Sequence, residues 1–316
     1  MSATTPAIAT FGGETMGTTW CVKCVAVRHD LHALHREVDA VLQDVIAQMS
    51  HWEPDSAISR FNRALAGWHP LPAELFTVLA FALEVARDSD GAFDPSIGEL
   101  VQLWGFGPQP NTRLPPNTAD IEAARTRSGW QRLQLRESDL LAWQPGGLQL
   151  DLSAIAKGHA VDRVAELLQA RGIDDALVEI GGELHGRGHK PDGSPWRVLV
   201  EHDPDHEQAE AEPPVLQLDG HAVATSGDRW HRHHLDAAVH AHTLDPRNGR
   251  PLPQAPTNVT VVAASAMRAD AWATALGVLG ADAGIAWATE RDIAVRFLLG
   301  DGSTRESPAF QQHLAA

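Results

Sequence analysis

The chain has 316 residues, 43% of them hydrophobic, so it can bury a large core in one elaborate domain or two lobes. Its formal net charge of −16 argues against a general nucleic-acid or anionic-membrane binder, and no apolar run approaches the ~20 residues of a membrane span. No export signal or lipobox cysteine is visible, and Cys21 and Cys24 predict two thiols rather than a disulfide or a zinc site, so a cytoplasmic protein is expected.

The first part of the chain predicts one strand, three helices and a second strand. In chain order they are a strand at Gly17–Val27, a helix beginning near Asp30, a helix at Pro72–Arg87, a short helix capped by Thr118 and a strand around Leu133 and Leu135. The helix near Asp30 rests on an apolar stripe that runs to Val45.

Residues 147–161 predict a strand that leads into a helix. The leucines of Leu148–Leu152 alternate with polar residues, which is typical of a half-buried strand. Lys157 and Gly158 are expected in the following turn, and an apolar pattern at helical spacing then runs to Gly172, which can cap the helix. Asp151, Lys157 and a helix N-terminus therefore meet at one strand end, where a phosphorylated ligand and a metal ion could be held.

The rest of the chain predicts several strands and two helices. The strands are expected at Ala176–Ile180, Arg197–Glu201, Val239–Leu244, Asn258–Ala263 and Ile293–Leu298, and the helices at Ala266–Leu279 and Asp282–Glu290. The acidic segment Asp203–Pro214 is expected to be a solvated loop. These elements predict a mixed α and β protein without a clear domain boundary.

Eight motifs follow one another along the chain. They read TMGTTW (Thr15–Trp20), SHWEPDSAISRFN (Ser50–Asn62), GAFDPSIGELVQLWGFG (Gly91–Gly107), DLSAIAKG (Asp151–Gly158), IGGELHGRG (Ile180–Gly188), ATSGD (Ala224–Asp228), HTLDPRNGRP (His242–Pro251) and MRADAWATALGVLG (Met267–Gly280). In this order and spacing they resemble the ApbE family of FAD:protein FMN transferases, from about residue 10 to residue 310. The resemblance implies a two-lobed, T-fold-related α+β architecture with antiparallel sheets packed by helices. It also implies a single domain at residues 10–312 after a short tail, residues 1–9.

Asp270 and Thr274 are candidate metal ligands. They are four residues apart, so a helix would place both side chains on one face, and both carry the hard oxygens that Mg²⁺ prefers. The resemblance implies that they bind Mg²⁺ across the FAD pyrophosphate together with the backbone carbonyl of Ala154. The alternative is that Asp270 merely caps a helix at Ala269–Leu279 and Thr274 is buried.

The resemblance also assigns residues to FAD. Lys157 and Asp151 match positions that contact FAD, and a lysine beside a pyrophosphate supplies charge during phosphoryl transfer. Without the family, the two would form a surface ion pair around a turn. Further FAD contacts are implied for Met16, Trp52, Ala92, Phe93, Asp94 and Leu244. Trp52 is suited to stacking on a planar ring, and the Asp94 carboxylate could accept from the adenine amino group, although an isolated methionine or tryptophan is more often a core residue.

His242 is the predicted general base. It precedes LDP where the family has a histidine, and its ordinary pKa near neutrality suits removal of a proton from an acceptor threonine. The neighbouring residues His231, His233, His234 and His240 could equally belong to a polar loop or bind metal adventitiously.

The resemblance thus implies a Mg²⁺-dependent enzyme that moves FMN from FAD to a threonine (or serine) hydroxyl of an acceptor flavoprotein, forms a phosphodiester bond and releases AMP. Two alternatives stay open, namely an FAD pyrophosphatase, in which water replaces threonine, and a non-catalytic flavin-binding protein. The expected partners are FAD, Mg²⁺ and the acceptor flavoprotein, with no nucleic acid and no membrane span.

Overall fold

An eight-stranded antiparallel sheet forms the centre of the protein, in the order β1-β2-β6-β7-β10-β15-β16-β17. The structure is a computed structural model that describes residues 7–26, 29–109, 115–201, 212–227, 233–235, 238–240, 243–252, 256 and 258–315. The strands of this main sheet are β1 (Ile8–Thr15), β2 (Thr18–Val25), β6 (Ala176–Ile180), β7 (Glu183–Arg187), β10 (His221–Gly227), β15 (Asn258–Ala263), β16 (Ala294–Leu298) and β17 (Thr304–Glu306).

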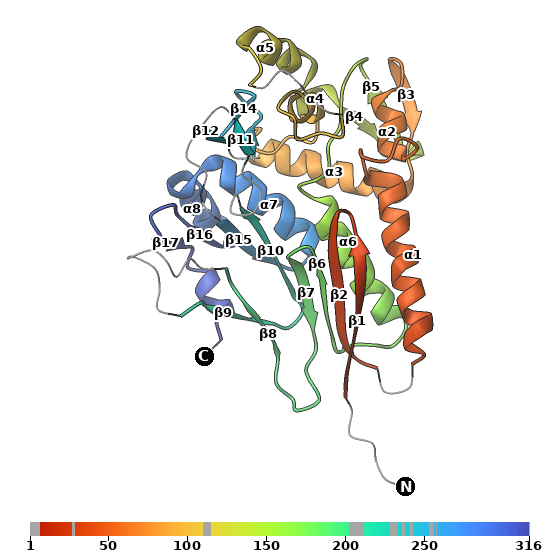
Figure 1. Cartoon of the computed structure of the whole chain (residues 1–316), viewed down its shortest axis with the longest axis vertical. Helices are drawn as coiled ribbons and strands as arrows, with labels where there is room; N and C mark the ends of the chain where they lie inside the picture. Colours follow the sequence, from red (N-terminus) through yellow and green to blue (C-terminus); the bar gives the residue numbers. More distant parts are fainter. Residues whose placement is uncertain are drawn as a thin grey trace.

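Helices cover one face of this sheet and form most of the upper part of the molecule (Figure 1). They are α1 (Leu31–Met49), α2 (Ala57–Asn62), α3 (Ala73–Asp88), α4 (Gly98–Leu103), α5 (Thr118–Arg127), α6 (Ala156–Ala170), α7 (Ala266–Leu279) and α8 (Ala281–Glu290), with short 3₁₀ turns η1 (Trp130–Arg132), η2 (Glu137–Asp139) and η3 (Phe310–His313). Helices α6 and α7 pack on the sheet and on each other, and α1 packs beside α6.

Four small antiparallel sheets complete the fold. They pair β3 (Gly67–Pro70) and β4 (Gln134–Arg136) on either side of β5 (Leu141–Gln144), β8 (Trp196–Leu199) with β9 (Val215–Leu218), β11 (His233–Leu235) with β12 (Ala238–His240), and β13 (Leu244–Asp245) with β14 (Arg250–Pro251). The protein is therefore of the α+β class with antiparallel sheets packed by helices, as predicted.

The period of two along the central strands divides the core between the two faces of the main sheet. Val178, Ala224 and Val261 belong to a large cluster that also contains the apolar sides of the helices. Val223 and its cross-strand partner Val262 point the other way, into a smaller cluster with β8, β9 and η3. The helix-covered face carries most of the core, and both α6 and α7 are fixed against it.

Most predicted elements are present. Strands β6 and β15 and helix α7 have the predicted bounds, while α3, α8, β8 and β16 are each displaced by one or two residues at an end. Helix α1 begins after Asp30, whose side chain accepts hydrogen bonds from the backbone N–H groups of His32 and Ala33 at 3.0 and 3.2 Å. Gly172 follows α6 in the left-handed conformation, with φ 75°, as expected for a glycine that ends a helix.

Three local predictions are wrong or incomplete. Asn117, not Thr118, caps α5, because its side-chain oxygen accepts from the backbone N–H of Asp120 at 2.9 Å. Lys157 and Gly158 lie in the first turn of α6 rather than in a turn before the helix. The strand expected at Val239–Leu244 appears as the short strands β12 and β13, and residues 241 and 242 are outside the described part of the chain.

The strand predicted at Leu148–Leu152 does not form, although all three leucines are buried. One edge of the segment is bridged in parallel to residues 95–98, by hydrogen bonds from Gly98 N–H to the Gln149 carbonyl at 3.0 Å and from Asp151 N–H to the Pro95 carbonyl at 2.9 Å. On the other edge, side-chain amides take the place of a second strand. Asn62 exchanges two hydrogen bonds with the backbone of Leu150, at 2.9 and 2.7 Å. Gln144 accepts from the N–H of Leu148 and donates to its carbonyl, at 3.0 and 3.1 Å. Apart from the single bridge, these contacts satisfy the buried backbone without a second strand. An alternating sequence pattern alone could not distinguish this arrangement from a regular strand.

The two thiols are free, as predicted. Cys24 is fully buried, which raises the pKa of its thiol to about 11. Within the described ranges, no helix is long and apolar enough to cross a membrane. The single domain expected at residues 10–312 stays a prediction, and most of the acidic loop expected at Asp203–Pro214 lies outside the described residues.

Candidate active site

A cavity of about 640 Å³ lies where the C-terminal part of β10, the start of β7, the first turn of α6 and the middle of α7 meet. It holds nine of the residues singled out from the sequence, namely Ala92, Phe93, Asp94, Asp151, Ala154, Lys157, Leu244, Asp270 and Thr274. These residues come from segments that are far apart in the chain. The fold therefore assembles most of the predicted set in one place.

Asp270 is anchored by the backbone of the neighbouring helix. It lies in the second turn of α7, where only 5% of its surface is exposed, and its Oδ2 accepts a hydrogen bond from the N–H of Gly158 at 3.0 Å. Gly158 is required at this contact, since a Cβ there would lie 2.3 Å from the carbonyl oxygen of Ala266. The cap of α7 is Ser265, whose hydroxyl accepts from Arg268 N–H, so the alternative in which Asp270 caps the helix is excluded.

A second carboxylate makes the reciprocal contact between the same helices. Asp162 of α6 accepts from the N–H groups of Ala266 and Met267, at 2.8 and 2.9 Å, and so caps α7 from outside. His185 of β7 lies 3.3 Å from the same carboxylate. Each helix thus supplies a carboxylate to a backbone amide near the start of the other, and this paired contact fixes where Asp270 points.

Lys157, Glu183 and Asp270 form a charged cluster in the cavity. The ammonium group of Lys157 donates to Glu183 Oε1, and Glu183 is 2% exposed. Burial and the nearby Asp270 raise the pKa of Glu183 to about 8, although Lys157 acts in the opposite direction. Burial alone would lower the pKa of Lys157, but Asp270, Glu183 and Glu179 together raise it. Burial also raises the pKa of Asp270, against the opposing effects of Lys157 and the Gly158 amide.

The cavity has an excess of acidic groups. Asp94, Asp151, Glu183, Glu201 and Asp270 line it, and Lys157 is the one lysine or arginine among the described residues that do so. A pyrophosphate would fit poorly into such surroundings unless a cation came with it. The donor set therefore fits a bound divalent cation better than it fits a bare anionic ligand.

The hydroxyl of Thr274 faces β10 one helical turn after Asp270. Its Oγ1 lies 3.5 Å from Ser226 Oγ, and Ala154, in the turn before α6, lines the same cavity. Among the described residues, no three His, Cys, Asp or Glu side chains are grouped to hold a metal on their own. A hard cation at this place would therefore draw on Asp270, a hydroxyl, a carbonyl and oxygen atoms of the ligand or water.

Asp94 is already engaged by the protein. Its Oδ1 accepts from the N–H and the hydroxyl of Ser96 at 2.8 and 2.6 Å, and its Oδ2 accepts from the N–H of Trp130 at 3.0 Å. Burial raises its pKa, and these hydrogen bonds act against the shift. Since a carboxylate offers about four acceptor positions, room remains for one donor of a ligand. The contact of Asp94 with adenine stays a prediction. Its hydrogen bonds to Ser96 and Trp130 also stabilise the chain around Trp130, which is an additional role.

Asp151 is also partly satisfied within the protein. Its Oδ1 accepts from Ser153 N–H at 2.8 Å, which shapes the turn that carries Ala154, and His51 Nδ1 lies 3.8 Å away. It does not pair with Lys157, so the simple surface ion pair considered from the sequence is absent. Asn62 does not line the cavity and instead holds the segment that leads to Asp151.

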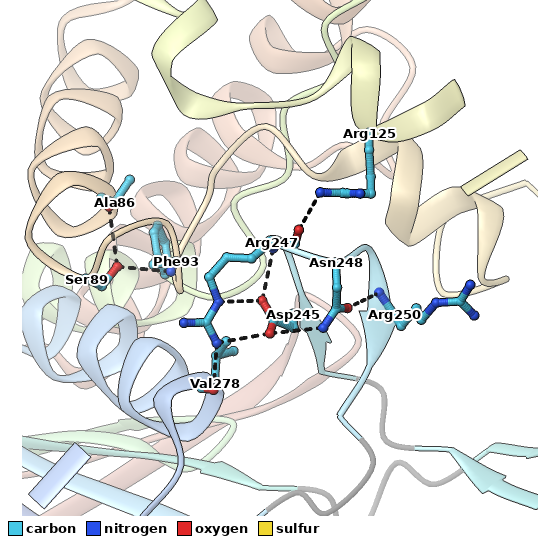
Figure 2. A network of polar contacts seen from close by, with 9 residues as sticks. All are labelled: Ala86, Ser89, Phe93, Arg125, Asp245, Arg247, Asn248, Arg250 and Val278. Carbon is cyan, nitrogen blue, oxygen red and sulfur yellow. Dashed lines mark hydrogen bonds and ion pairs between the residues drawn. The ribbon is translucent and has the colours of Figure 1, made fainter. Parts of the chain in front are cut away.

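Strand β13 and the residues on either side of it form another wall of the cavity, through Thr243, Leu244 and Pro246. Figure 2 shows how it is braced: the Arg247 guanidinium donates to both oxygens of Asp245, at 2.9 and 3.0 Å, and reaches the carbonyl of Val278 at the end of α7. Asn248 donates to Asp245, and Arg125 of α5 donates to the carbonyl of Arg247. The predicted base His242, which precedes Thr243 in the sequence, lies outside the described residues.

Met16 and Trp52 are not among the residues that line this cavity. Met16 sits at the tip of the β1–β2 hairpin with φ 48° and lines a separate hollow of about 840 Å³ with Glu14, Glu53 and Asp55. Trp52 is 57% exposed, and its ring stacks obliquely on His51 at 5.6 Å. Their predicted FAD contacts therefore stay untested predictions.

Several residues of the cavity were not chosen from the sequence. Glu183 follows Gly181 and Gly182, whose positive φ angles of 60° and 102° turn the chain back between β6 and β7. The two glycines belong to the motif IGGELHGRG, but nothing in the sequence showed that the next carboxylate would be buried against Lys157. The hydrogen bond between the Thr225 and Thr260 hydroxyls, at 3.0 Å, depends on the register of β10 and β15 and could not be predicted from the sequence either.

Comparison with known proteins gives consistent matches. The model of the ApbE family matches residues 16–297. A Klebsiella pneumoniae protein named FAD:protein FMN transferase is 35% identical over 99% of this chain and 93% of its own length, and a Salmonella typhimurium protein of the same name is 34% identical over 98% and 91%. The apo form of Pseudomonas stutzeri flavinyl transferase ApbE is 38% identical, with a TM-score of 0.91 over 100% of this chain and 99% of that one. The flavin transferase ApbE from Vibrio cholerae is 34% identical, with a TM-score of 0.89 over 98% and 100%.

Proposed function

The chain belongs to the ApbE family and is a transferase, and from that premise we propose that it is a Mg²⁺-dependent FAD:protein FMN transferase. It would move the FMN half of FAD to a threonine or serine hydroxyl of an acceptor flavoprotein and release AMP. The proposal combines the names of the relatives with the residues that this chain places in its cavity.

One observation carries the proposal: Lys157, Asp270 and Thr274 meet in a cavity of the size that cofactor sites usually have. The lining of the cavity also includes apolar side chains from separate parts of the fold, Phe93 and Leu244 together with Val198 and Leu216 of β8 and β9. A dinucleotide whose pyrophosphate lay at the cluster would thus have apolar side chains available for its two ring systems.

The side chains divide the chemistry among them. Lys157 has two N–H donors left after its bond to Glu183, and they can hold phosphate oxygens where negative charge grows in the transition state. Asp270, Thr274 and the carbonyl of Ala154 would hold Mg²⁺, which when bound neutralises charge on the phosphates. His242 would take the proton of the acceptor hydroxyl as its oxygen attacks the phosphorus on the FMN side, and the bond to AMP breaks.

The test is a transfer assay with FAD, Mg²⁺ and a flavoprotein acceptor. The expected result is flavin fluorescence on the denatured acceptor, a mass gain of one FMN and one AMP released per modified threonine. Free FMN and AMP without acceptor labelling would identify an FAD pyrophosphatase, and tight FAD binding without either product would identify a flavin-binding protein. Failure with several authentic acceptors would refute the transferase.

The compartment of the protein and the residue modified on the acceptor need separate tests. The cytoplasmic location expected from the sequence stays a prediction, and fractionation of cells that produce the protein tests it. A threonine-to-alanine substitution in the acceptor should abolish labelling, whereas threonine-to-serine should preserve it if a hydroxyl is all that the reaction needs.

A further inference from the structure

Glu183 is the least exposed acidic residue that lines the cavity, and the proposed function gives it no role. It enters the cavity directly after the Gly181–Gly182 turn, which is held against β2 by a hydrogen bond from Gly181 N–H to the carbonyl of Thr19 at 3.0 Å. A Cβ at Gly181 would lie 2.8 Å from Thr18 Cγ2, so the turn has little freedom to shift. The backbone at Glu183 is thus firmly placed.

The two oxygens of Glu183 differ in their surroundings. Oε1 accepts from Lys157, while Oε2 is buried and has no hydrogen-bond partner among the described residues. Burying a carboxylate in this way costs free energy unless it is paired. The ion pair with Lys157 is the contact that offsets this cost, so the two side chains depend on each other.

Lys157 needs such an anchor. Its side chain is long and still 31% exposed, and three carboxylates, those of Asp270, Glu183 and Glu179, act on its charge. Without a fixed partner the ammonium group could reach solvent or swing toward Glu179, because a lysine side chain has several freely rotating bonds. The hydrogen bond to Glu183 engages one N–H donor and leaves two that a ligand can accept from.

We propose that Glu183 is a positioning residue that holds the Lys157 ammonium group at the phosphate position of the cavity. The inference rests on the proposed function for the place of the phosphates, but its core, the dependence of Lys157 on Glu183, concerns the protein alone. Glu183 acts through Lys157 and does not itself react.

The first test needs no turnover. The chain contains three lysines, Lys23, Lys157 and Lys190, so acetylation with limiting reagent can be followed at each by mass spectrometry. In Glu183→Met, which keeps the length of the side chain and removes both oxygens, labelling of Lys157 relative to Lys190 should rise at least about threefold, because the amine loses its partner. An unchanged ratio overturns the inference, whether or not the protein transfers FMN.

The second test is a double-mutant cycle on transfer. Lys157→Met should lower kcat by about 10²- to 10³-fold, the usual range for one donor to a developing oxyanion. Glu183→Met should lower kcat at least tenfold with less than about a threefold change in FAD affinity, and should have no further effect in the Lys157→Met background. Glu183→Gln, which keeps one acceptor oxygen, should recover part of the loss. Equal losses of Glu183→Met in both backgrounds would show that Glu183 does not act through Lys157.

A thermal melt of each variant separates positioning from folding. A buried methionine in place of a buried carboxylate is expected to be tolerated, since replacing buried charge by an apolar side chain is often neutral or stabilising. A wild-type protein that fails to transfer FMN refutes the proposed function, and the labelling ratio then still decides the inference.

Discussion

The contact of α6 and α7 at Gly158 allows a stability prediction with a matched control. In Gly158→Ala the new methyl group would lie 2.3 Å from the carbonyl oxygen of Ala266 and 2.8 Å from the Cβ of Asp270. Both neighbours belong to α7, so the two helices must separate. In Gly277→Ala, also inside a helix, the nearest atom is Val259 Cγ2 at an ordinary 3.6 Å.

The two substitutions should change the free energy of unfolding in opposite directions. Overpacking costs about 1–3 kcal/mol, and loss of the charged hydrogen bond from Gly158 N–H to Asp270 costs about 1.5–3 kcal/mol. The better helix propensity of alanine returns about 1 kcal/mol. Gly158→Ala should therefore lower the free energy of unfolding by about 1.5–5 kcal/mol, whereas Gly277→Ala should raise it by about 0.5–1 kcal/mol.

Urea denaturation of the three proteins, followed by tryptophan fluorescence, measures both differences. The midpoint should move in opposite directions for the two variants, with little change in the slope. A Gly158→Ala protein as stable as Gly277→Ala would refute the close approach of the helices and with it the anchoring of Asp270. A stable Gly158→Ala protein that has lost only Mg²⁺ affinity would also contradict the predicted cost.

Three further predictions concern charged groups in or beside the cavity. Asp270→Ala should lower FMN transfer on the order of 100-fold at any Mg²⁺ concentration, because a charged ligand is lost, and full activity of this variant at limiting Mg²⁺ would exclude Asp270 as a ligand. Thr274→Val should lose less transfer activity and recover it in excess Mg²⁺, whereas Thr274→Ser should stay near wild type. The pKa of Glu183 is raised from 4.5 to about 8, so the folded protein binds this proton more tightly, and the free energy of unfolding should fall as the pH rises through that window. Glu183→Gln should flatten this fall in urea titrations with EDTA, and an identical pH profile would contradict the shift. Asp245→Ala should destabilise the protein by about 1–3 kcal/mol, because the hydrogen bonds from Arg247 and Asn248 that support the wall at Leu244 are lost. It should also raise KM for FAD more than it lowers kcat, and an unchanged KM would show that this wall does not touch FAD.

Elements with strong local signals were predictable. The cap at Asp30 and the apolar stripe that follows it define α1, and the cap at Ser265 with an alanine-rich run defines α7. Strands β6 and β15 are mainly apolar because both faces of the main sheet are covered, so their bounds were clear. Strand β1 was missed, since its glycines and threonines alternate weakly and it is defined by pairing with β2.

The site was predictable where it depends on helical spacing and hidden where it depends on contacts between distant segments. The spacing of Asp270 and Thr274 placed both on the cavity side of α7, and DLSAIAKG brought Asp151 and Lys157 to the same cavity. No local sequence pattern indicated that Glu183 would accept a hydrogen bond from Lys157, or that Asp94 would accept hydrogen bonds from Ser96 and Trp130. Those partners are set by tertiary packing.

The side-chain support of Leu148 and Leu150 has a consequence for amide hydrogen exchange. Both amides are buried and hydrogen-bonded, so they should exchange slowly, and an exchange map would show a protected segment that looks like a strand. In a sheet such protection is shared among many ladder bonds. Here each amide relies on one side chain, so Asn62→Ala should expose Leu150, and Gln144→Ala should expose Leu148, while the main sheet stays protected.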